Sequence, residues 1–231
     1  MILELCANGF ESAFIAQEAG LDRIELCENL SIGGITPSKK LIEKVVNELS
    51  IPTHVLIRPR AGNFSYTQEE IAAMIEGIQF CKAIGCAGIV SGILTPKKTI
   101  AIAETQELIE ASEGMEFTFH RAFDVCENPL QEISTLKKLR ITRLLSSGQA
   151  VTAIQGIDTL IKLQQKIEGV FQLMPGGGIT SSNVLQFQEQ GFEMVHFSAV
   201  PKTNATQTLF NNEVVGVSDS KEVHKIKSMV S

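Results

Sequence analysis

The sequence predicts an α/β fold of the (β/α)8 TIM-barrel class, with a single domain and a shortened or irregular C-terminal segment. The first observation behind this prediction is that short apolar runs alternate with longer stretches of helical periodicity, eight times along 231 residues. The second is that about one helix separates each strand from the next, which is typical of parallel pairing. Eight such units can close into a barrel.

The predicted strands are short apolar runs that end at polar or glycine-rich turns. They cover residues 2–7, 23–27, 53–57, 88–91, 116–119, 143–145, 171–174 and 194–197. The apolar composition of these runs indicates that the strands are buried.

The predicted helices follow the strands and carry sequence signals at their ends. They cover residues 10–19, 39–49, 67–84, 99–112, 129–139, 154–167, 182–189 and 221–230. Thr67 and Glu70 have the spacing of a capping box, Gly85 follows a helix end, and Pro129 occupies a first-turn position.

The barrel is expected to occupy residues 1–200, because no linker or shift in composition divides this part of the chain. Residues 201–219 are polar and irregular, where a barrel would place its last loop and helix. The tail of residues 201–231 is therefore predicted to complete the barrel with a short terminal helix. It would cover one end of the barrel or a partner subunit, and the alternative is a loosely ordered surface segment.

Composition excludes several classes of partner. With 44% hydrophobic and 20% charged residues, the chain can bury one sizeable core. A net charge of -6 and a pI of about 5.3 give no electrostatic footprint for nucleic acid or an anionic membrane. No apolar run approaches the roughly 20 residues that span a bilayer.

The cysteines and the N-terminus predict a cytoplasmic protein. Five cysteines form an odd set without the spacing of a disulfide scaffold, which suits a reducing compartment. The N-terminus enters a strand at once, without the basic and apolar regions of a signal peptide.

Polar side chains stand at the ends of several apolar runs. A lone ion in a dry interior costs several kcal/mol, so these groups are expected to meet in a shared mouth that a ligand can reach. They are Glu4, Glu25, Arg58, Arg60, His120, Arg121, Asp124, His196 and Ser198.

Alternation along the first two strands predicts which side chains enter the lumen. Glu4 and Cys6 share one face of the first strand, and Arg23, Glu25 and Cys27 share one face of the second. The opposite faces carry leucine and isoleucine, which suit packing against the helices. The acidic groups and both thiols are therefore expected to point inward, side by side on strands about 4.8 Å apart.

Seven motifs together give the chain a resemblance to a known family. They are Glu-Leu-Cys at 25–27, Gly-Gly-Ile-Thr-Pro-Ser at 33–38, Ile-Arg-Pro-Arg at 57–60, Thr-Phe-His-Arg-Ala-Phe-Asp at 118–124, Ser-Ser-Gly-Gln at 146–149, Gly-Gly-Gly-Ile at 176–179 and Val-His-Phe-Ser-Ala at 195–199. With them, residues 1–200 resemble the CutC family, which is named for copper homeostasis. The resemblance implies a cytoplasmic TIM barrel, often a homo-oligomer, with a link to copper ions. The C-terminus is shorter than the family pattern.

Cys6 and Cys27 are the predicted metal ligands. Soft thiolates select Cu(I), and two suitably placed sulfurs can bind it. The alternative is that both are small apolar fillers of the interior, because free cysteine is among the most buried residue types. Cys126, just beyond Asp124, is a third candidate thiol.

A second group of residues points to acid–base chemistry. The reference pKa of histidine, about 6.5, would let His120 transfer protons near neutral pH. Glu4 and Glu25 could orient a substrate, act as bases or pair with nearby arginines, and ion pairing alone remains an alternative role for them. The predicted catalytic set is Glu4, Glu25, Arg58, His120, Arg121 and Asp124.

Late turns and basic side chains predict binding of an anion. TIM barrels often hold phosphate with the loops after strands seven and eight, where glycine lets backbone N–H groups approach closely. The planar donor fork of arginine matches carboxylate or phosphate. The predicted ligand-binding set is Arg60, Ser147, Gly148, Gly176, Gly177, Gly178, His196 and Ser198.

Three functions follow from the sequence. The first is a copper-handling protein, on the family resemblance and the cysteine pair. The second is an enzyme that acts on a small phosphorylated or carboxylated metabolite. The third is a non-catalytic scaffold whose barrel serves oligomer assembly.

Overall fold

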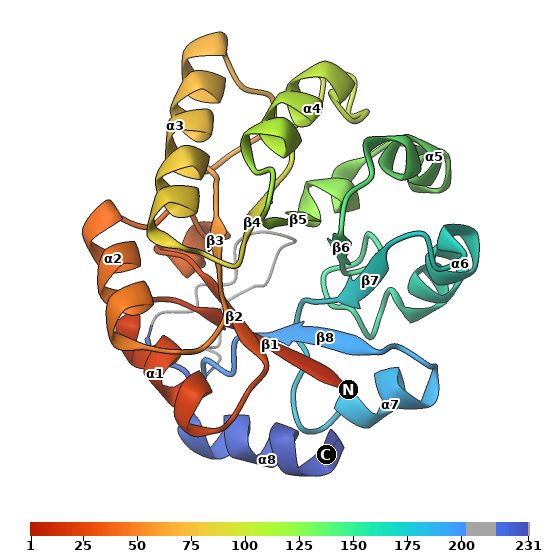
Figure 1. The fold of residues 1–231 in the computed structure, drawn as a ribbon. Coiled ribbons are helices and arrows are strands. Elements are labelled where there is room, and N and C mark those ends of the chain that lie inside the picture. Colours follow the sequence, from red (N-terminus) through yellow and green to blue (C-terminus); the bar gives the residue numbers. More distant parts are fainter. Residues whose placement is uncertain (202–215, 231) are drawn as a thin grey trace.

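Eight parallel strands form the wall of a barrel, and helices surround it on the outside (Figure 1). This computed structural model describes residues 1–201 and 216–230. The strands are β1 (Ile2–Ala7), β2 (Arg23–Leu26), β3 (Thr53–Leu56), β4 (Gly88–Ser91), β5 (Glu116–Phe119), β6 (Arg143–Ser146), β7 (Gln172–Pro175) and β8 (Met194–Phe197). The predicted (β/α)8 class is therefore confirmed.

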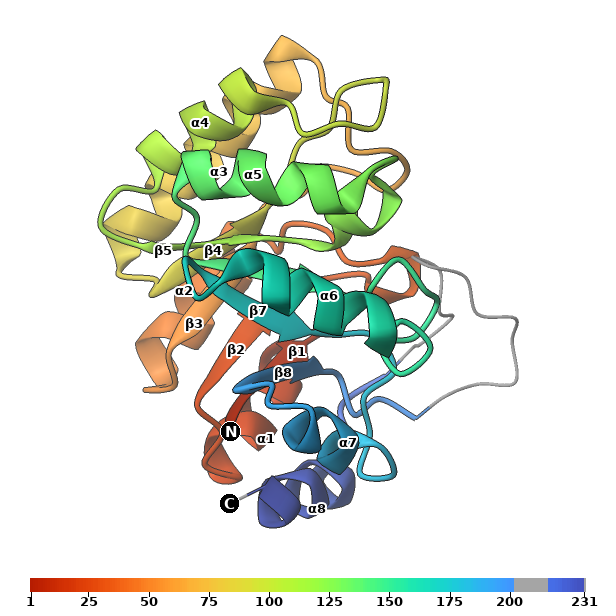
Figure 2. The same cartoon turned by 90° about the vertical axis from the view of Figure 1, so that its right-hand side faces the viewer.

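The helices alternate with the strands along the chain, as the side view also shows (Figure 2). They are α1 (Phe10–Glu18), α2 (Lys39–Glu48), α3 (Gln68–Ile84), α4 (Ile102–Ala111), α5 (Pro129–Leu139), α6 (Ile157–Ile167), α7 (Val184–Glu189) and α8 (Ser220–Val230). Two 3-10 helices that the sequence did not predict, η1 (Leu30–Ile32) and η2 (Arg121–Val125), follow β2 and β5.

The sheet closes between β7 and β8. Neighbouring strands pair in the order β7-β6-β5-β4-β3-β2-β1-β8, and a single parallel bridge between Gly176 and His196 joins the two ends. A Cβ at Gly176 would come within 2.5 Å of the Leu145 side chain and 3.1 Å of the His196 Cβ. Glycine is required there because the strands approach closely at this point.

Side chains alternate between the helices and the lumen as predicted. Leu3 and Ile24 are fully buried in the main core beneath the helices. Cys6 and Cys27 belong to a separate apolar cluster together with Leu56 and Val90, inside the barrel. The parallel register places Glu4 opposite Arg23 and Cys6 opposite Glu25, so polar groups of β1 and β2 enter the lumen together.

Local signals set the ends of several helices. Thr67 and Glu70 form the predicted capping box at the start of α3, and Gly85 ends that helix with a φ of 88°. Helix α6 begins three residues later than predicted, at Ile157. The preceding turn packs Gly148 against Gly156 so closely that a Cβ at Gly148 would lie 2.3 Å from the Gly156 carbonyl oxygen.

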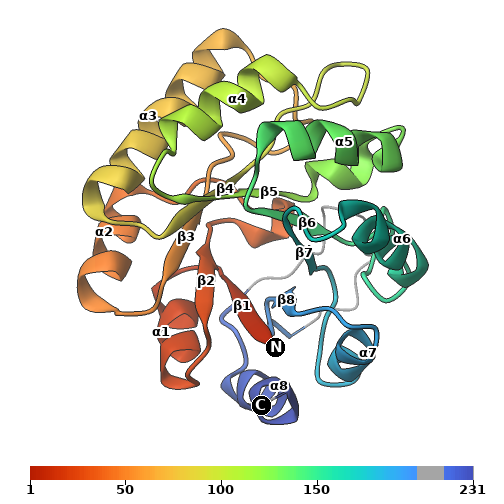
Figure 3. The ribbon, with the colours of Figure 1, turned by 45° about the vertical axis from the view of Figure 1, so that its right-hand side comes forward.

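The C-terminal helix packs beside the start of the chain. Helix α8 contacts α1 and α7, and the two termini lie close together (Figure 3). Glu222 in α8 accepts hydrogen bonds from the backbone N–H and the hydroxyl of Ser181. The late eighth helix is thus confirmed, whereas most of the predicted irregular segment lies outside the described residues. None of the described helices has the length and apolar character needed to cross a membrane.

Truncation of Ile24 tests the packing of the strands against the helices. We expect Ile24→Ala to lower the free energy of unfolding by about 2–5 kcal/mol, because it removes a fully buried side chain from the main core. The matched control is Ile102→Ala, whose side chain is 56% exposed. Urea denaturation of both variants measures the difference, and equal losses would contradict this account of the core.

Candidate functional site

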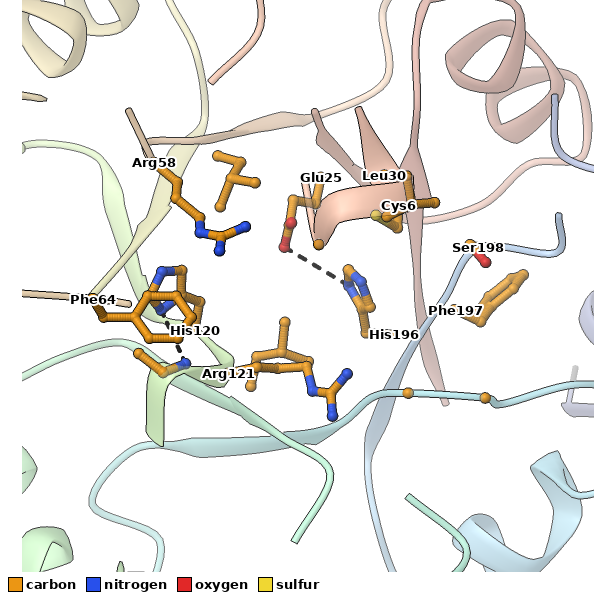
Figure 4. Close-up of a pocket in the computed structure, with 16 residues that line it drawn as sticks. Cys6, Glu25, Leu30, Arg58, Phe64, His120, Arg121, His196, Phe197 and Ser198 are labelled. Carbon is orange, nitrogen blue, oxygen red and sulfur yellow. Dashed lines mark hydrogen bonds and ion pairs between the residues drawn. The ribbon is translucent and has the colours of Figure 1, made fainter. Parts of the chain in front are cut away.

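A pocket lies at the carboxyl ends of the strands, with a cavity volume of about 120 Å³ (Figure 4). Its wall combines acidic, basic, thiol and apolar side chains. The lining residues are Cys6, Glu25, Leu30, Gly33, Leu56, Arg58, Phe64, His120, Arg121, Ala122, Leu145, Gly177, Gly178, His196, Phe197 and Ser198. This is the end of a barrel at which TIM-barrel proteins build their functional sites.

Glu4 lies beneath the pocket and is fully buried. Its carboxylate accepts hydrogen bonds from Arg23 Nε and from His196, whose Nδ1 lies 2.8 Å from Oε1. Burial acts to raise the pKa of Glu4, but the hydrogen bond and charge of His196, together with the charge of Arg23, lower it far below its usual value. Glu4 is therefore ionised, and its carboxylate holds the side chains of Arg23 and His196.

The two thiols lie together beside His196. The Sγ atoms of Cys6 and Cys27 are 3.7 Å apart, and both residues are buried. The hydrogen bond with Cys27 and burial raise the pKa of Cys6 well above its usual value. Burial acts to lower the pKa of His196. The charge of Glu25 and hydrogen bonds with Cys6 and Glu4 outweigh burial and raise that pKa well above its usual value.

Glu25 faces the pocket with an unsatisfied oxygen. Its Oε2 is buried, has no hydrogen-bond partner among the described residues and lies 3.9 Å from His196 Nδ1. Burial raises the pKa of Glu25 to about 7, the positive charge of His196 opposes the rise, and the charge of Glu4 adds to it. Cys6, Glu25 and His196 each offer one atom that could bind a metal ion, and these three atoms lie within 4.8 Å of one another.

His120 is a neutral hydrogen-bond donor in this structure. Its Nδ1 accepts the backbone N–H of Ala122, so the proton of the neutral ring resides on Nε2, which is buried and unpaired. Burial and the positive charge of Arg58 lower the pKa of His120 to about 3. The sequence-based expectation for His120 used the reference pKa of an exposed imidazole, whereas burial in the structure favours the neutral ring at neutral pH.

Arg58 enters the same side of the pocket from the turn after β3. Its guanidinium donates to the backbone carbonyls of Ile32, Gly34 and Gly62, which hold it in place. The Arg58 Nε atom is buried without a partner, and no carboxylate among the described residues forms an ion pair with Arg58. The guanidinium also stacks over the Phe64 ring, with Cζ 5.0 Å from its centroid.

Asp124 stabilises the turn after β6 and does not line the pocket. Its carboxylate accepts from the hydroxyls of Ser146 and Ser147, from the backbone N–H groups of Ser147 and Gln149, and from Arg121 Nε at 2.9 Å. Arg121 also donates to the Ser147 hydroxyl. Asp124, which the sequence analysis placed in the catalytic set, therefore positions Arg121.

The structure brings most of the predicted residues together. Those that line the pocket are Cys6, Glu25, Arg58, His120, Arg121, Gly177, Gly178, His196 and Ser198. Three more lie directly behind the wall: Glu4, Cys27 and Gly176. Residues His120 and Arg121 both reach the pocket because the chain turns into η2 after β5, which removes the strict alternation of a strand.

Several residues that were predicted to belong to the site do not line the pocket. Arg60 forms an ion pair with Glu70 of the α3 capping box. Ser147 and Gly148 take part in the turn that Asp124 fastens, and their polar groups have partners there. Cys126 lies outside the pocket lining and donates weakly to the Ala122 carbonyl.

Some functional contacts were missed by the sequence analysis. Glu4 pairs with Arg23 and His196 instead of the loop arginines, and the shared face of the first two strands was the signal that could have identified Arg23. Phe64, which supports both Arg58 and His120, lies in a loop without a recognisable motif.

The architecture and the pocket define the class of protein. It is a single-domain (β/α)8 barrel with a pocket at the carboxyl ends of its strands, where thiols, imidazoles, carboxylates and arginines meet. Residues 1–201 match the CutC family, and a relative in this family aligns with the entire chain at 36% identity. The chain belongs to the CutC family.

Named relatives illustrate this similarity. A CutC family protein of Glaesserella parasuis is 36% identical over 100% of this chain and 99% of its own. A CutC family protein of Proteus mirabilis is 39% identical over 95% of this chain and 87% of its own. The CutC protein of Streptococcus agalactiae, which carries the name copper homeostasis protein, has a crystal structure that superposes with a TM-score of 0.81. It is 32% identical over 86% of this chain and 98% of its own.

Removal of the Asp124 carboxylate tests its positioning role. We expect Asp124→Ala to lower the free energy of unfolding by about 3–5 kcal/mol, since it leaves Arg121 and the serine turn without their buried acceptor. Asp158→Ala is the control, because Asp158 is exposed, and it should change stability by less than about 0.5 kcal/mol. Urea denaturation gives both values, and a small effect at Asp124 would contradict the positioning role.

Acidification tests the depressed pKa of His120. The folded state keeps the ring neutral down to about pH 3, whereas the unfolded chain binds a proton below about pH 6.5. The free energy of unfolding therefore falls as the pH is lowered, and His120 contributes about 2 kcal/mol of this loss between pH 7 and pH 5.

The comparison variant is His120→Asn, which cannot titrate. Its free energy of unfolding should decrease between these pH values by about 2 kcal/mol less than that of the wild type. Identical pH profiles for the two proteins would show that the pKa of His120 is not depressed.

Proposed function

We propose that this chain binds Cu(I) as its cargo through the sulfurs of Cys6 and Cys27, with the imidazole of His196 beside them. The observation that carries the proposal is the 3.7 Å separation of the two sulfur atoms at the base of the pocket. Thiolates are the soft ligands that Cu(I) prefers, and imidazole also suits copper. Cys6 and His196 line the pocket, so an ion can reach them from the barrel mouth.

The contacts of His196 support a role as a metal ligand. A ligating histidine commonly donates its other ring N–H to a carboxylate, which fixes the ring orientation and raises its basicity. Here Nδ1 of His196 is held by the ionised Glu4, so Nε2 is the ring nitrogen that would bind the metal. The Glu4–Arg23 pair in turn holds the carboxylate in place.

Protonation of the thiols sets the conditions for binding. The metal must replace the thiol protons and the proton on Nε2 of His196, because thiolate and neutral imidazole are the ligands. Since the pKa of Cys6 is raised by the hydrogen bond with Cys27 and by burial, the affinity for Cu(I) is expected to increase with pH. The reducing cytoplasm, which we propose as the location of the protein, would keep the thiols and the copper ion reduced.

Membership of the CutC family also supports the proposal. The similar protein of Streptococcus agalactiae is named a copper homeostasis protein. We extend this role to the present chain on the basis of its own thiol pair.

Competition with a chromophoric Cu(I) chelator under anaerobic, reducing conditions tests the proposal. The Cys6→Ser/Cys27→Ser variant should lose at least about 100-fold in Cu(I) affinity, because even the loss of an outer partner costs about 10–100-fold at metal sites. The matched control is Cys81→Ser/Cys86→Ser, which changes another buried cysteine pair outside the pocket and should retain the wild-type affinity.

Glu25→Gln separates Cu(I) from a harder metal. A carboxylate is a poor ligand for Cu(I) but a common one for Zn²⁺, so this variant should keep its Cu(I) affinity within about threefold. Unchanged Cu(I) binding in the Cys6/Cys27 variant would refute the proposed site. Tighter binding of Zn²⁺ than of Cu(I), lost in Glu25→Gln, would reassign the site to zinc.

A further inference from the structure

The wall of the pocket formed by Arg58, Phe64 and His120 contains two buried donors for which residues 1–201 and 216–230 offer no acceptor in hydrogen-bonding geometry. These are Nε of Arg58 and Nε2 of His120. Both residues are at least 95% buried, and both line the pocket. A buried N–H group without a partner costs about 1–3 kcal/mol, and more when it is charged.

The side chains of Arg58 and His120 both pack against Phe64. The guanidinium of Arg58 stacks over its ring at 5.0 Å, and the imidazole of His120 meets the same ring edge-on with the centroids 5.0 Å apart. The close-up shows Arg58, Phe64 and His120 grouped on one side of the pocket, with Cys6 and His196 on the other (Figure 4).

The charges at this wall favour an anion. Arg58 is buried as a cation; its guanidinium bonds to backbone carbonyls and interacts with the Tyr66 hydroxyl, and no carboxylate among the described residues pairs with it. His120 next to it can only donate from Nε2, because Nδ1 is occupied as an acceptor. A buried guanidinium without a counter-ion and a neighbouring N–H donor leave one kind of group missing, which is a negatively charged oxygen.

We propose that this wall is a binding subsite for the carboxylate or phosphate group of a small organic anion, whose oxygen accepts hydrogen bonds from Arg58 Nε and His120 Nε2. The cavity volume of about 120 Å³ is enough to hold a carboxylate or phosphate group together with part of the organic ligand that carries it. The rest of the ligand extends toward Glu25, whose unpaired oxygen faces the same pocket. This inference is independent of copper, because it uses none of the proposed metal ligands.

NMR of the imidazole nitrogens tests the subsite with inorganic phosphate and malonate as probes. The metal-free protein with ¹⁵N-labelled histidine should show a saturable downfield shift of the His120 Nε2–H proton with at least one probe. A response to phosphate alone indicates a phosphorylated ligand, a response to malonate alone indicates a carboxylated one, and responses to both support the shared oxyanion chemistry. No response to either probe would overturn the proposal.

Two variants of His120 keep the test independent of folding. His120→Gln places an amide N–H near the position of Nε2 and should bind the probe within about threefold of wild type. His120→Asn places an amide oxygen near Nδ1 and removes the outer donor, so it should lose about tenfold or more in affinity. Both variants are checked by circular dichroism, and equal affinities of His120→Asn and wild type in calorimetric titrations would overturn the proposal.

Arginine variants provide a second comparison. Arg58→Gln should lose at least about tenfold in affinity for the probe, whereas Arg60→Gln, whose partner is Glu70 outside the pocket, should not. The Cys6→Ser/Cys27→Ser variant should keep its affinity for the probe. Its failure to bind the probe, with intact folding, would show that the anion depends on the thiols and would refute the subsite as assigned.

Discussion

The buried carboxylate of Glu4 connects strands β1, β2 and β8 through its bonds to Arg23 and His196. An ion at this depth is tolerated only because both oxygens have charged or polar partners. The same pairing holds Nδ1 of His196, whose ring also interacts with the thiol of Cys6. The orientation of His196 in the pocket therefore depends on the buried carboxylate of Glu4.

The pocket has two halves with different chemistry. One side carries sulfur and imidazole, which are soft donors for a metal ion, and the other carries N–H donors of Arg58 and His120, which suit oxygen anions. Burial and hydrogen bonding set the protonation state of a group in each half. The hydrogen bond with Cys27 and burial keep the Cys6 thiol protonated, and burial keeps the His120 ring neutral.

Much of the fold could be predicted because its signals are local. Strand β1 spans the predicted residues, and the capping box of Thr67 and Glu70 marks the start of α3. Alternation correctly predicted that Glu4 and Cys6 face the lumen. Alternation does not apply beyond β5, because the chain enters a 3-10 turn after His120. The presence of polar residues near strand ends could not distinguish residues that line the pocket from supporting residues such as Asp124.

The sequence by itself determined the barrel, the inward face of the first two strands and the set of polar residues at its mouth, because periodicity and burial act over a few neighbouring residues. Only the tertiary structure decided the partners and protonation states of that set. Glu4 and His196 are separated by 192 positions in the chain, yet they share a hydrogen bond of 2.8 Å. Pairings of this kind depend on strand register and barrel closure, and the electrostatic environment of each group follows from them.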